Sequence, residues 1–266
     1  MTDKYDRIGD TYDTTRRADP KIVQTLRHHV DLRPSGQYLD IGCGTGNYTT
    51  ALNKIGGKWT GLEPASEMLD LARKKDGSID WVQGGAEALP FEDDTIDGVI
   101  CTAAIHHFTD LGKAFREMGR VLRPNGKLVI FTATPDQVSR YWITHYFPEM
   151  MKKDYEQLPS IDQMESHLQA IQLRIVEIEP FYITNEIEDF LFFSGKHRPS
   201  MYLSHDIRNG MSCFRTLISD DELASGLASL KNDIEDGSID RIIDDSHNDL
   251  GDYCFVVVAN TQPRDA

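Results

Sequence analysis

The sequence predicts an α/β protein built around a mostly parallel, doubly wound sheet with helices on both faces. Between residues 20 and 133, short apolar segments alternate with segments whose apolar residues recur at the helical period. This alternation is typical of strands joined by crossover helices. The first apolar segment runs directly into a glycine-rich turn, "GCGTG" at 42–46. A chain of 266 residues is also long enough to bury a full core.

Each element follows from a local pattern. The first helix is predicted over 20–31, because Pro20 suits a first helical turn and apolar residues then recur on one face. Seven strands are predicted from apolar runs, at 38–42, 58–64, 79–85, 96–103, 127–133, 174–183 and 251–260. Four further helices are predicted, at 47–56, 66–75, 111–122 and 160–173. The segment "RPNG" at 123–126 is predicted to be a turn.

The alternation ends after residue 134. Roughly 65 residues separate the last two predicted strands, and segments such as "NEIEDFLFF" and "DDELASGLASLKNDIEDG" have a helical pattern. That length exceeds a connecting loop and predicts a helical lid inserted before the last strand. We therefore expect a single domain with four parts. They are an N-terminal cap (1–34), a cofactor-binding core (35–134), the remainder of the sheet (135–183 and 251–262) and the lid insertion (184–250).

Composition narrows the class of protein. The net charge of −15 argues against a nucleic-acid partner and against an anionic membrane surface. The polar, acidic N-terminus does not resemble a signal peptide, and no apolar run approaches the roughly 20 residues that span a bilayer. The four cysteines are far apart and form no CxxC pair, which predicts neither a zinc site nor a disulfide framework. We expect a cytoplasmic protein with reduced cysteines.

The glycine-rich turn predicts a ligand site. Three glycines lie between a predicted strand and a predicted helix: Gly42, Gly44 and Gly46. Asn47 stands where the dinucleotide pattern GxGxxG would need its last glycine. Asp40 would repel a pyrophosphate but suits a positively charged ligand; a helix cap is the alternative role for this carboxylate. Glu63 follows roughly 20 residues later at a strand end, where a carboxylate can accept both ribose hydroxyls.

Four stretches together resemble the class I S-adenosylmethionine-dependent methyltransferases, in particular their type 11, small-molecule branch. They are "YLDIGCGTGNYT", "GLEPASEML", "GGAEALPFEDDTIDGVICTAAIHHF" and "REMGRVLRPNGKLVIFT", in the family's order and spacing. The opening "YDTTRRADP" is similar to the N-terminal cap of this branch. The resemblance implies a Rossmann-like fold and S-adenosylmethionine as the cofactor, with S-adenosylhomocysteine as its product and no metal.

The resemblance also implies roles for particular residues. Asp40, Gly42, Cys43 and Gly44 would line the methionine part of the cofactor, with Thr102 beneath it and Tyr12 and Arg16 at its carboxylate. Glu63 would hold the ribose, and the adenine would lie among Pro64, Met68, Ala86 and Glu87. Gly85 is a departure, because the family usually has an aspartate there that accepts the adenine amino group. Backbone groups or Glu87 would have to substitute for it. For Tyr12 and Arg16, a surface helix start is the alternative.

The methyl acceptor is less well specified. The aromatic stretch "QVSRYWITHYFPEMM" contains Tyr141, Trp142 and His145. It predicts either an acceptor pocket beside the methyl group or packing within the lid. The basic stretch around Arg198 predicts either an anionic acceptor or internal pairing with acidic helices. The chain lacks the NPPY or DPPY tetrapeptide of amino-group DNA methyltransferases, which again argues against a nucleic-acid substrate.

The twin histidines after the fourth predicted strand are candidates for acid–base chemistry. His106 and, in the aromatic stretch, His145 are the candidate general bases by position. The "HHF" sequence is common in the resembled family across dissimilar acceptors, so a scaffold role is the alternative. We expect His106 to border the active site and His107 to pack beneath it.

Together these patterns predict an enzyme that transfers a methyl group to an oxygen or nitrogen of a small molecule by in-line displacement. The alternative is a catalytically silent protein that binds S-adenosylmethionine as a regulator or partner. A dehydrogenase is disfavoured by Asp40 and Asn47. The chain is expected to be a monomer or a homodimer.

Overall fold

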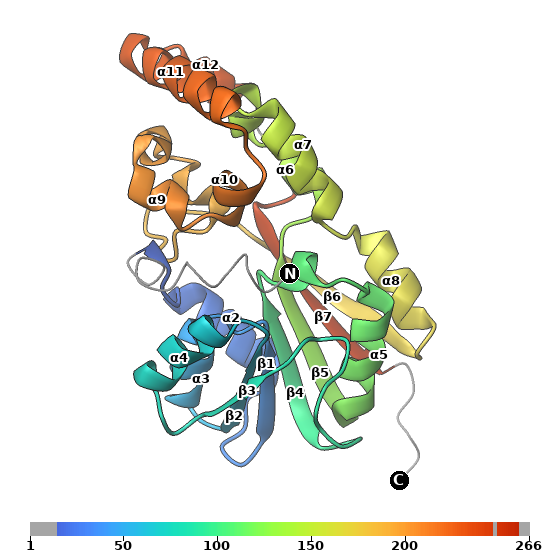
Figure 1. Cartoon of the computed structure of the whole chain (residues 1–266). Helices are drawn as coiled ribbons and strands as arrows, with labels where there is room; N and C mark the ends of the chain where they lie inside the picture. Colours follow the sequence, from blue (N-terminus) through green and yellow to red (C-terminus); the bar gives the residue numbers. More distant parts are fainter. Residues whose placement is uncertain (1–14, 247–248, 261–266) are drawn as a thin grey trace.

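A seven-stranded sheet forms the centre of the protein, as the computed structural model of the chain shows (Figure 1). The structure describes residues 15–246 and 249–260. The strands lie in the order β3-β2-β1-β4-β5-β7-β6, and β7 runs antiparallel to both of its neighbours. The strands are β1 (Gln37–Ile41), β2 (Lys58–Glu63), β3 (Asp80–Gln83), β4 (Ile96–Thr102), β5 (Leu122–Thr132), β6 (Leu173–Phe181) and β7 (Tyr253–Asn260). The predicted doubly wound, mostly parallel sheet is confirmed.

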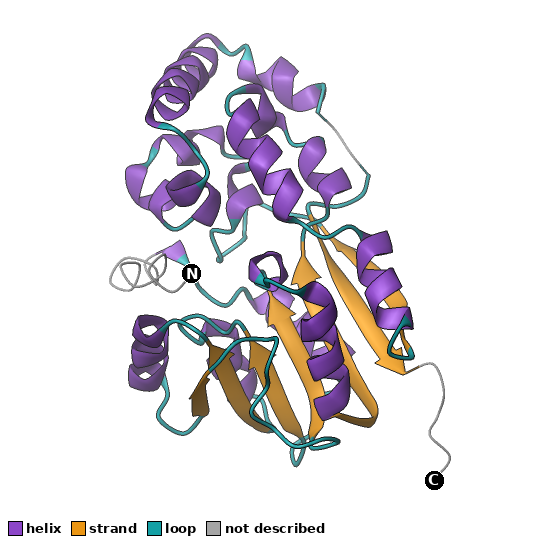
Figure 2. Ribbon diagram, turned by 45° about the vertical axis from the view of Figure 1, so that its right-hand side comes forward, coloured by secondary structure: helices purple, strands orange, loops and turns teal. Residues whose placement is uncertain are grey.

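Helices cover both faces of the sheet, and each face has its own buried core. On one face, α2 and α3 contribute Ile22, Leu26 and Leu52 to the apolar core. On the other face, α5 and α8 contribute Phe115 and Leu168. The helices of the sheet region are α2 (Pro20–His29), α3 (Asn47–Asn53), α4 (Ser66–Lys75), α5 (Leu111–Val121) and α8 (Ile161–Gln169). Figure 2 shows strands and helices as these layers.

A separate layer of helices stands beyond the carboxyl ends of the parallel strands (Figures 1 and 2). It contains α6 (Pro135–Ser139), α7 (Pro148–Gln157), α9 (His205–Asn209), α10 (Ser212–Thr216), α11 (Asp220–Asp236) and α12 (Ile239–Asp244). Short 3-10 turns join them: η3 (Trp142–His145), η4 (Phe192–Gly195) and η5 (Pro199–Leu203).

This layer, which we call the lid, is assembled from two segments of the chain. The Tyr146 hydroxyl donates to Asp233 at 2.8 Å, and Glu222 accepts backbone hydrogen bonds from Glu149 and Met150 at 2.8 and 3.0 Å. Residues 135–157, which we expected to belong with the sheet, therefore pack against the insertion.

Two local expectations are wrong for identifiable reasons. The segment 123–126, predicted to be a turn, lies within β5, where the pairing with β4 shifts register and Asn125 takes a φ of 69°. The helical pattern of 185–193 gives no helix before Phe192. In that segment the Phe190 N–H instead donates to the carbonyl of Thr15, so long-range hydrogen bonds replace the helical ones.

None of the helices in the described part of the chain is long and apolar enough to span a bilayer. All four cysteines lie in that part, and none is in a disulfide.

Two helices begin with the same capping box but in different surroundings. Thr134 and Gln137 cap α6, and Ser160 and Gln163 cap α8. The buried Gln137 amide also donates to the carbonyls of Leu250 and Tyr253, at 2.9 and 3.0 Å. Gln137 thus joins the start of the lid to the start of β7, whereas Gln163 is exposed.

We expect Gln137→Met to lower the free energy of unfolding by about 2–4 kcal/mol, because the cap is lost and the buried Tyr253 carbonyl and the partly buried Leu250 carbonyl lose their donor. Gln163→Met should cost about 1 kcal/mol, since only a solvent-exposed cap is lost. Denaturant unfolding of both variants measures the difference. Equal losses would contradict the role of Gln137 as a tie between lid and sheet.

Candidate functional site

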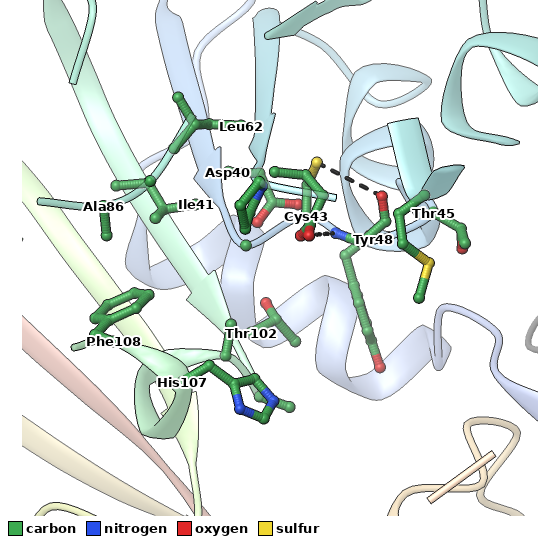
Figure 3. A pocket seen from close by; sticks show the side chains of 18 of the residues that line it. Asp40, Ile41, Cys43, Thr45, Tyr48, Leu62, Ala86, Thr102, His107 and Phe108 are labelled. Atoms are coloured by element: carbon green, nitrogen blue, oxygen red, sulfur yellow. Dashed lines mark hydrogen bonds between the residues drawn. The ribbon is translucent and has the colours of Figure 1, made fainter. Parts of the chain in front are cut away.

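A cavity lies at the carboxyl ends of β1 and β4, where the strand order reverses. Ligands of doubly wound sheets bind at this switch point. The cavity has a volume of about 260 Å³, and we call it the cofactor cavity. Figure 3 shows side chains from the ends of both strands around it, including Asp40 and Cys43 from β1 and its turn and Thr102 and His107 from β4 and beyond.

The glycine turn approaches the cavity with its bare backbone. Gly44 and Gly46 have φ values of 55° and 74°, in the left-handed region that favours glycine. A Cβ on Gly44 would meet nothing within 4 Å and would extend into the cavity that the residue lines. A Cβ on Gly46 would instead lie 2.3 Å from the ring of Trp81. One glycine keeps space for a ligand, and the other permits core packing.

Asp40 is buried at the floor of the cavity. The Thr49 hydroxyl donates to its Oδ2 at 2.6 Å, while its Oδ1 is buried without a partner among the described residues. Burial raises the pKa of Asp40 to about 7, and Glu63 adds to the rise, while the Thr49 hydrogen bond opposes it. A buried carboxylate with an unmet oxygen is stabilised by a positively charged or hydrogen-bonding ligand.

Glu63, at the end of β2, is held in place by backbone groups on both of its oxygens. The Gly44 N–H donates to Oε2 and the Ala65 N–H donates to Oε1, each at 3.1 Å. Burial raises the pKa of Glu63, and these two hydrogen bonds oppose the rise. Each oxygen keeps a further acceptor position, so the carboxylate can accept two neighbouring hydroxyls.

Glu87 occupies the space that a side chain at Gly85 would fill. Its Oε2 lies 3.2 Å from the position of a Cβ on Gly85. Its Oε1 accepts hydrogen bonds from the Thr109 N–H, the Thr109 hydroxyl and the Asp110 N–H, at 2.7, 2.9 and 3.3 Å. Burial acts against ionisation, but these hydrogen bonds hold the pKa of Glu87 below its usual value. Glu87 is therefore an ionised acceptor beside the expected adenine position.

The loop that carries Glu87 is fixed to α5. The Arg120 guanidinium donates to the carbonyls of Leu89 and Phe91, and Glu117 accepts from the Leu89 N–H at 2.8 Å. Arg120 also pairs with Glu117 and Asp93. Arg120 and Glu117 of α5 thus hold the loop that carries Glu87.

Arg16 is held by a carboxylate from the lid. Its Nε and Nη2 donate to Asp189 at 2.5 and 3.3 Å, and Asp189 is almost fully buried. The Tyr48 hydroxyl, from α3, donates to the same carboxylate at 2.9 Å. Burial raises the pKa of Tyr48, which keeps its phenol neutral. This cluster joins the segment before α2, the helix after the glycine turn and the lid.

A second cavity, of about 120 Å³, adjoins the first and lies under the lid. We call it the acceptor cavity, after the methyl acceptor that the sequence leads us to expect. Arg16, Ala103 and His107 line both cavities and so mark their junction. His106 lines the acceptor cavity but not the cofactor cavity. Its ring centroid is 3.9 Å from that of His107. We expected His107 to pack beneath the site; both histidines instead reach it, because the turn η2 (Ile105–His107) presents adjacent rings.

Three residues of the aromatic stretch lie elsewhere. Tyr141, Trp142 and His145 line a separate outer pocket and neither of the two cavities described above. The Tyr141 and Tyr202 hydroxyls are hydrogen-bonded at 2.5 Å, and the Trp142 Nε1 donates to the carbonyl of Lys196 at 3.2 Å. Their polar ends are thus used to join the two lid segments, which corresponds to the packing alternative.

Arg198 lies behind the acceptor cavity and outside its lining. Its guanidinium lies over the ring of Phe190, at 5.8 Å from the centroid, and Phe190 lines the cavity.

The remaining predicted cofactor residues are brought together. The cofactor cavity is lined by Arg16, Asp40, Gly42, Cys43, Gly44, Glu63, Pro64, Met68, Gly85, Ala86, Glu87 and Thr102. Tyr12 lies outside the described residues. Burial raises the pKa of Cys43 well above its usual value, so this residue is a neutral thiol.

Three residues that line the two cavities were not predicted from the sequence: Asp189, Tyr48 and Asp154. Tyr48 was inside the quoted glycine motif, where its position in the first turn of the following helix was the available signal. Asp189 and Asp154 come from the lid, and no local pattern distinguishes them from other acidic residues.

One group in the described chain has metal-ligand geometry: His29, Glu177 and Glu179. The carboxylates lie near different ring nitrogens of His29, Glu179 at 2.7 Å from Nε2 and Glu177 at 3.8 Å from Nδ1. The buried His29 thus ties α2 to β6 through these two acids.

A glycine turn and two buried carboxylates at the switch point define a nucleotide-binding protein of the doubly wound α/β class. Comparison with known proteins narrows the class. Residues 39–130 match the sequence model of the methyltransferase domain family. A solved structure from Anabaena variabilis, described as a methyltransferase from an antibiotic biosynthesis pathway, is 32% identical. The match covers 92% of this chain and 99% of that one, with a TM-score of 0.82.

Two curated relatives are also similar. The demethylmenaquinone methyltransferase of Bacillus cereus is 26% identical over 215 residues, covering 67% of this chain and 89% of the relative. The methyltransferase YcgJ of Bacillus subtilis is 31% identical over 148 residues, covering 54% of this chain and 51% of the relative. The chain therefore belongs to the class I S-adenosylmethionine-dependent methyltransferases, type 11 branch.

Substitution by alanine should have different effects at Gly44 and at Gly46. Gly44→Ala should cost about 1 kcal/mol of unfolding free energy, from positive φ alone, and should weaken S-adenosylhomocysteine binding at least tenfold. Gly46→Ala should cost a further ~1–3 kcal/mol, because the new methyl group overlaps Trp81. Denaturant unfolding and calorimetric titration measure the two quantities. A Gly44→Ala variant that bound normally would contradict the assignment of the cavity.

Proposed function

We propose that the protein transfers a methyl group from S-adenosylmethionine, held in the cofactor cavity, to an oxygen or nitrogen of a small molecule held in the acceptor cavity. The observation that carries the proposal is the pair of adjoining cavities with a shared junction at Arg16, Ala103 and His107. A catalytically silent cofactor-binding protein would not need the second cavity.

The residues present fit the cofactor. The Oδ1 of Asp40 and the Oγ1 of Thr102 are buried polar atoms without a partner in the described part of the chain, and a ligand would satisfy them. Glu63 would hold the ribose hydroxyls, and Met68, Ala86 and Glu87 would surround the adenine. Arg16 would bind the carboxylate of the methionine part while keeping its pairing with Asp189.

When bound, S-adenosylmethionine supplies an electrophilic methyl group on a sulfonium. The chain's own contribution is alignment and exclusion of water. Asp40 would supply negative charge close to the cationic part of the cofactor. The lid would cover the acceptor, since η4 and α10 form walls of the acceptor cavity.

A hydroxyl or an ammonium acceptor also requires a base. His106 remains our candidate for this role, and His107 joins it as a residue that lines both cavities. His145 lies in the outer pocket, so we do not retain it as a base. Tyr141 and Trp142 are likewise replaced as acceptor contacts by Phe190, Phe192 and Phe193.

The direct test is a calorimetric titration with S-adenosylmethionine, followed by a screen of amine and hydroxyl acceptors that detects S-adenosylhomocysteine. We expect binding and acceptor-dependent product. Failure to bind the cofactor would overturn the proposal, and binding without turnover on any acceptor would favour the silent alternative.

The affinity for S-adenosylmethionine should depend on the ionisation of Asp40. Because burial raises the pKa of Asp40 to about 7, a cationic ligand binds the ionised form that predominates above this pH. The affinity should therefore weaken about tenfold between pH 8 and pH 6, as one proton must be released on binding. Asp40→Asn should bind more weakly and without this pH dependence. The same dependence in the variant would exclude Asp40 as its source.

Glu87 should recognise the amino group of adenine in place of the aspartate missing at Gly85. The wild-type protein should bind S-adenosylhomocysteine at least tenfold more tightly than its deaminated analogue, S-inosylhomocysteine, as expected for one charge-assisted hydrogen bond. In Glu87→Ala the two ligands should bind almost equally. Competition titrations measure the ratio, and an unchanged preference in the variant would rule out this role.

A further inference from the structure

The acceptor cavity has an apolar wall that is largely aromatic. Phe190, Phe192, Phe193, Tyr253 and Met211 line it. The rings contact one another: the centroids of Phe193 and Tyr253 are 5.0 Å apart, and those of Phe192 and Phe193 are 5.4 Å apart. A wall of this kind binds apolar or aromatic groups, and its ring faces also attract cations.

One carboxylate enters this apolar setting from α7. Asp154 lies four residues after Met150 and three after Met151, which are both buried, so it occupies the inward face of the helix. It is half-buried and lines the acceptor cavity. The Asp154 carboxylate makes no hydrogen bond or ion pair with any residue in 15–246 or 249–260.

A carboxylate in such a position is costly without a partner. Burial raises the pKa of Asp154 to about 6, which is the direction expected when no cation or donor offsets the loss of water. On the same helix, the neighbouring Lys153 turns outward and donates to the carbonyl of Leu217. Helix α7 therefore keeps its neighbouring charge, Lys153, at the surface, and Asp154 is directed into the cavity.

Other charged and titratable groups face the acceptor cavity. Arg16 is paired with Asp189, Arg215 enters from α10, and the two histidines lie at the junction. Cys213 also lines the cavity, and burial, together with the nearby Asp154 charge, raises the pKa of its thiol, so Cys213 stays neutral. Asp154 is the only carboxylate among the described residues of the lining.

We propose that the acceptor cavity binds a molecule with an ammonium group on an apolar or aromatic body, and that Asp154 pairs with the ammonium. The proposal rests on the proposed function, in which this cavity holds the methyl acceptor. The aromatic wall would take the body of the molecule, and the unpartnered carboxylate would gain the counter-charge that it lacks. Asp154 is thus a specificity-determining residue.

The test uses three probes of similar size: phenethylamine, 2-phenylethanol and 3-phenylpropanoate, which are cationic, neutral and anionic at pH 8. Each is titrated calorimetrically into the full chain, with and without saturating S-adenosylhomocysteine. We expect phenethylamine to bind more tightly than the other two. Asp154→Asn should weaken it at least tenfold and leave 2-phenylethanol unchanged. Glu156→Gln, which removes the same charge from an exposed position of α7, is the matched control and should bind like wild type.

The pH dependence provides a second readout. Phenethylamine binding should weaken about tenfold between pH 8 and pH 5, as Asp154 becomes protonated, and Asp154→Asn should lose this dependence. Ligand-free Asp154→Asn should melt no lower than wild type at pH 8, because an unpaired carboxylate has been removed. That measurement excludes misfolding as the cause of weaker binding.

Tighter binding of 3-phenylpropanoate would overturn the proposal and point to Arg215 as the recognition group. Equal binding of phenethylamine by wild type and Asp154→Asn would also overturn it. If S-adenosylhomocysteine binds but phenethylamine does not, only this inference fails. If S-adenosylhomocysteine itself does not bind, the proposed function fails, and the titrations without it still decide the role of Asp154.

Discussion

The ion pair between Arg16 and Asp189 connects the parts of the protein that form the site. Arg16 belongs to the segment before α2, and Asp189 belongs to the lid, 173 positions away in sequence. Tyr48 adds the first turn of α3 to the same buried carboxylate. Removing one partner of such a pair leaves an uncompensated buried charge, so the pair constrains how the lid is placed over the sheet. Both cavities meet at Arg16, and their junction therefore depends on this contact.

Polar groups that lack a hydrogen-bond or charge partner among the described residues are concentrated in the two adjoining cavities. Asp40 and Thr102 have buried oxygens without partners among the described residues, and the Asp154 carboxylate, likewise unpaired among them, lines the acceptor cavity. Each lowers the stability of the ligand-free protein and is compensated when a ligand of the right charge binds. The aromatic residues of the lid have the opposite character. Tyr141 and Trp142 satisfy their polar ends within the lid and so stabilise its structure.

The sheet and the cofactor side could be predicted because their signals are local. The glycine turn, Asp40 and Glu63 follow from the backbone of a strand, a turn and a helix, and the predicted α4 matches the observed Ser66–Lys75. Glu87 was one of two substitutes considered for the aspartate missing at Gly85; the structure adds that its carboxylate lies where that side chain would be.

The acceptor side could not be predicted in the same way. Asp189 and Asp154 are single acidic residues whose meaning comes from partners far away in sequence. The aromatic stretch at 141–147 has the composition of a pocket. The hydrogen bond between Tyr141 and Tyr202 instead places it where the two chain segments of the lid meet. The helical pattern of 185–193 was overridden by contacts of the same long-range kind, such as that between Phe190 and Thr15. Lid residues are positioned by tertiary contacts, and local periodicity carries little information about those.

The central claim is that one cavity holds the cofactor and that its reactive end opens into the other. A crystal structure of the chain with S-adenosylhomocysteine tests this claim most directly. We expect the ribose hydroxyls on Glu63, the adenine beside Glu87 and the sulfur at the junction formed by Arg16, Ala103 and His107. A sulfur that faced solvent, or one walled off from the acceptor cavity, would contradict it.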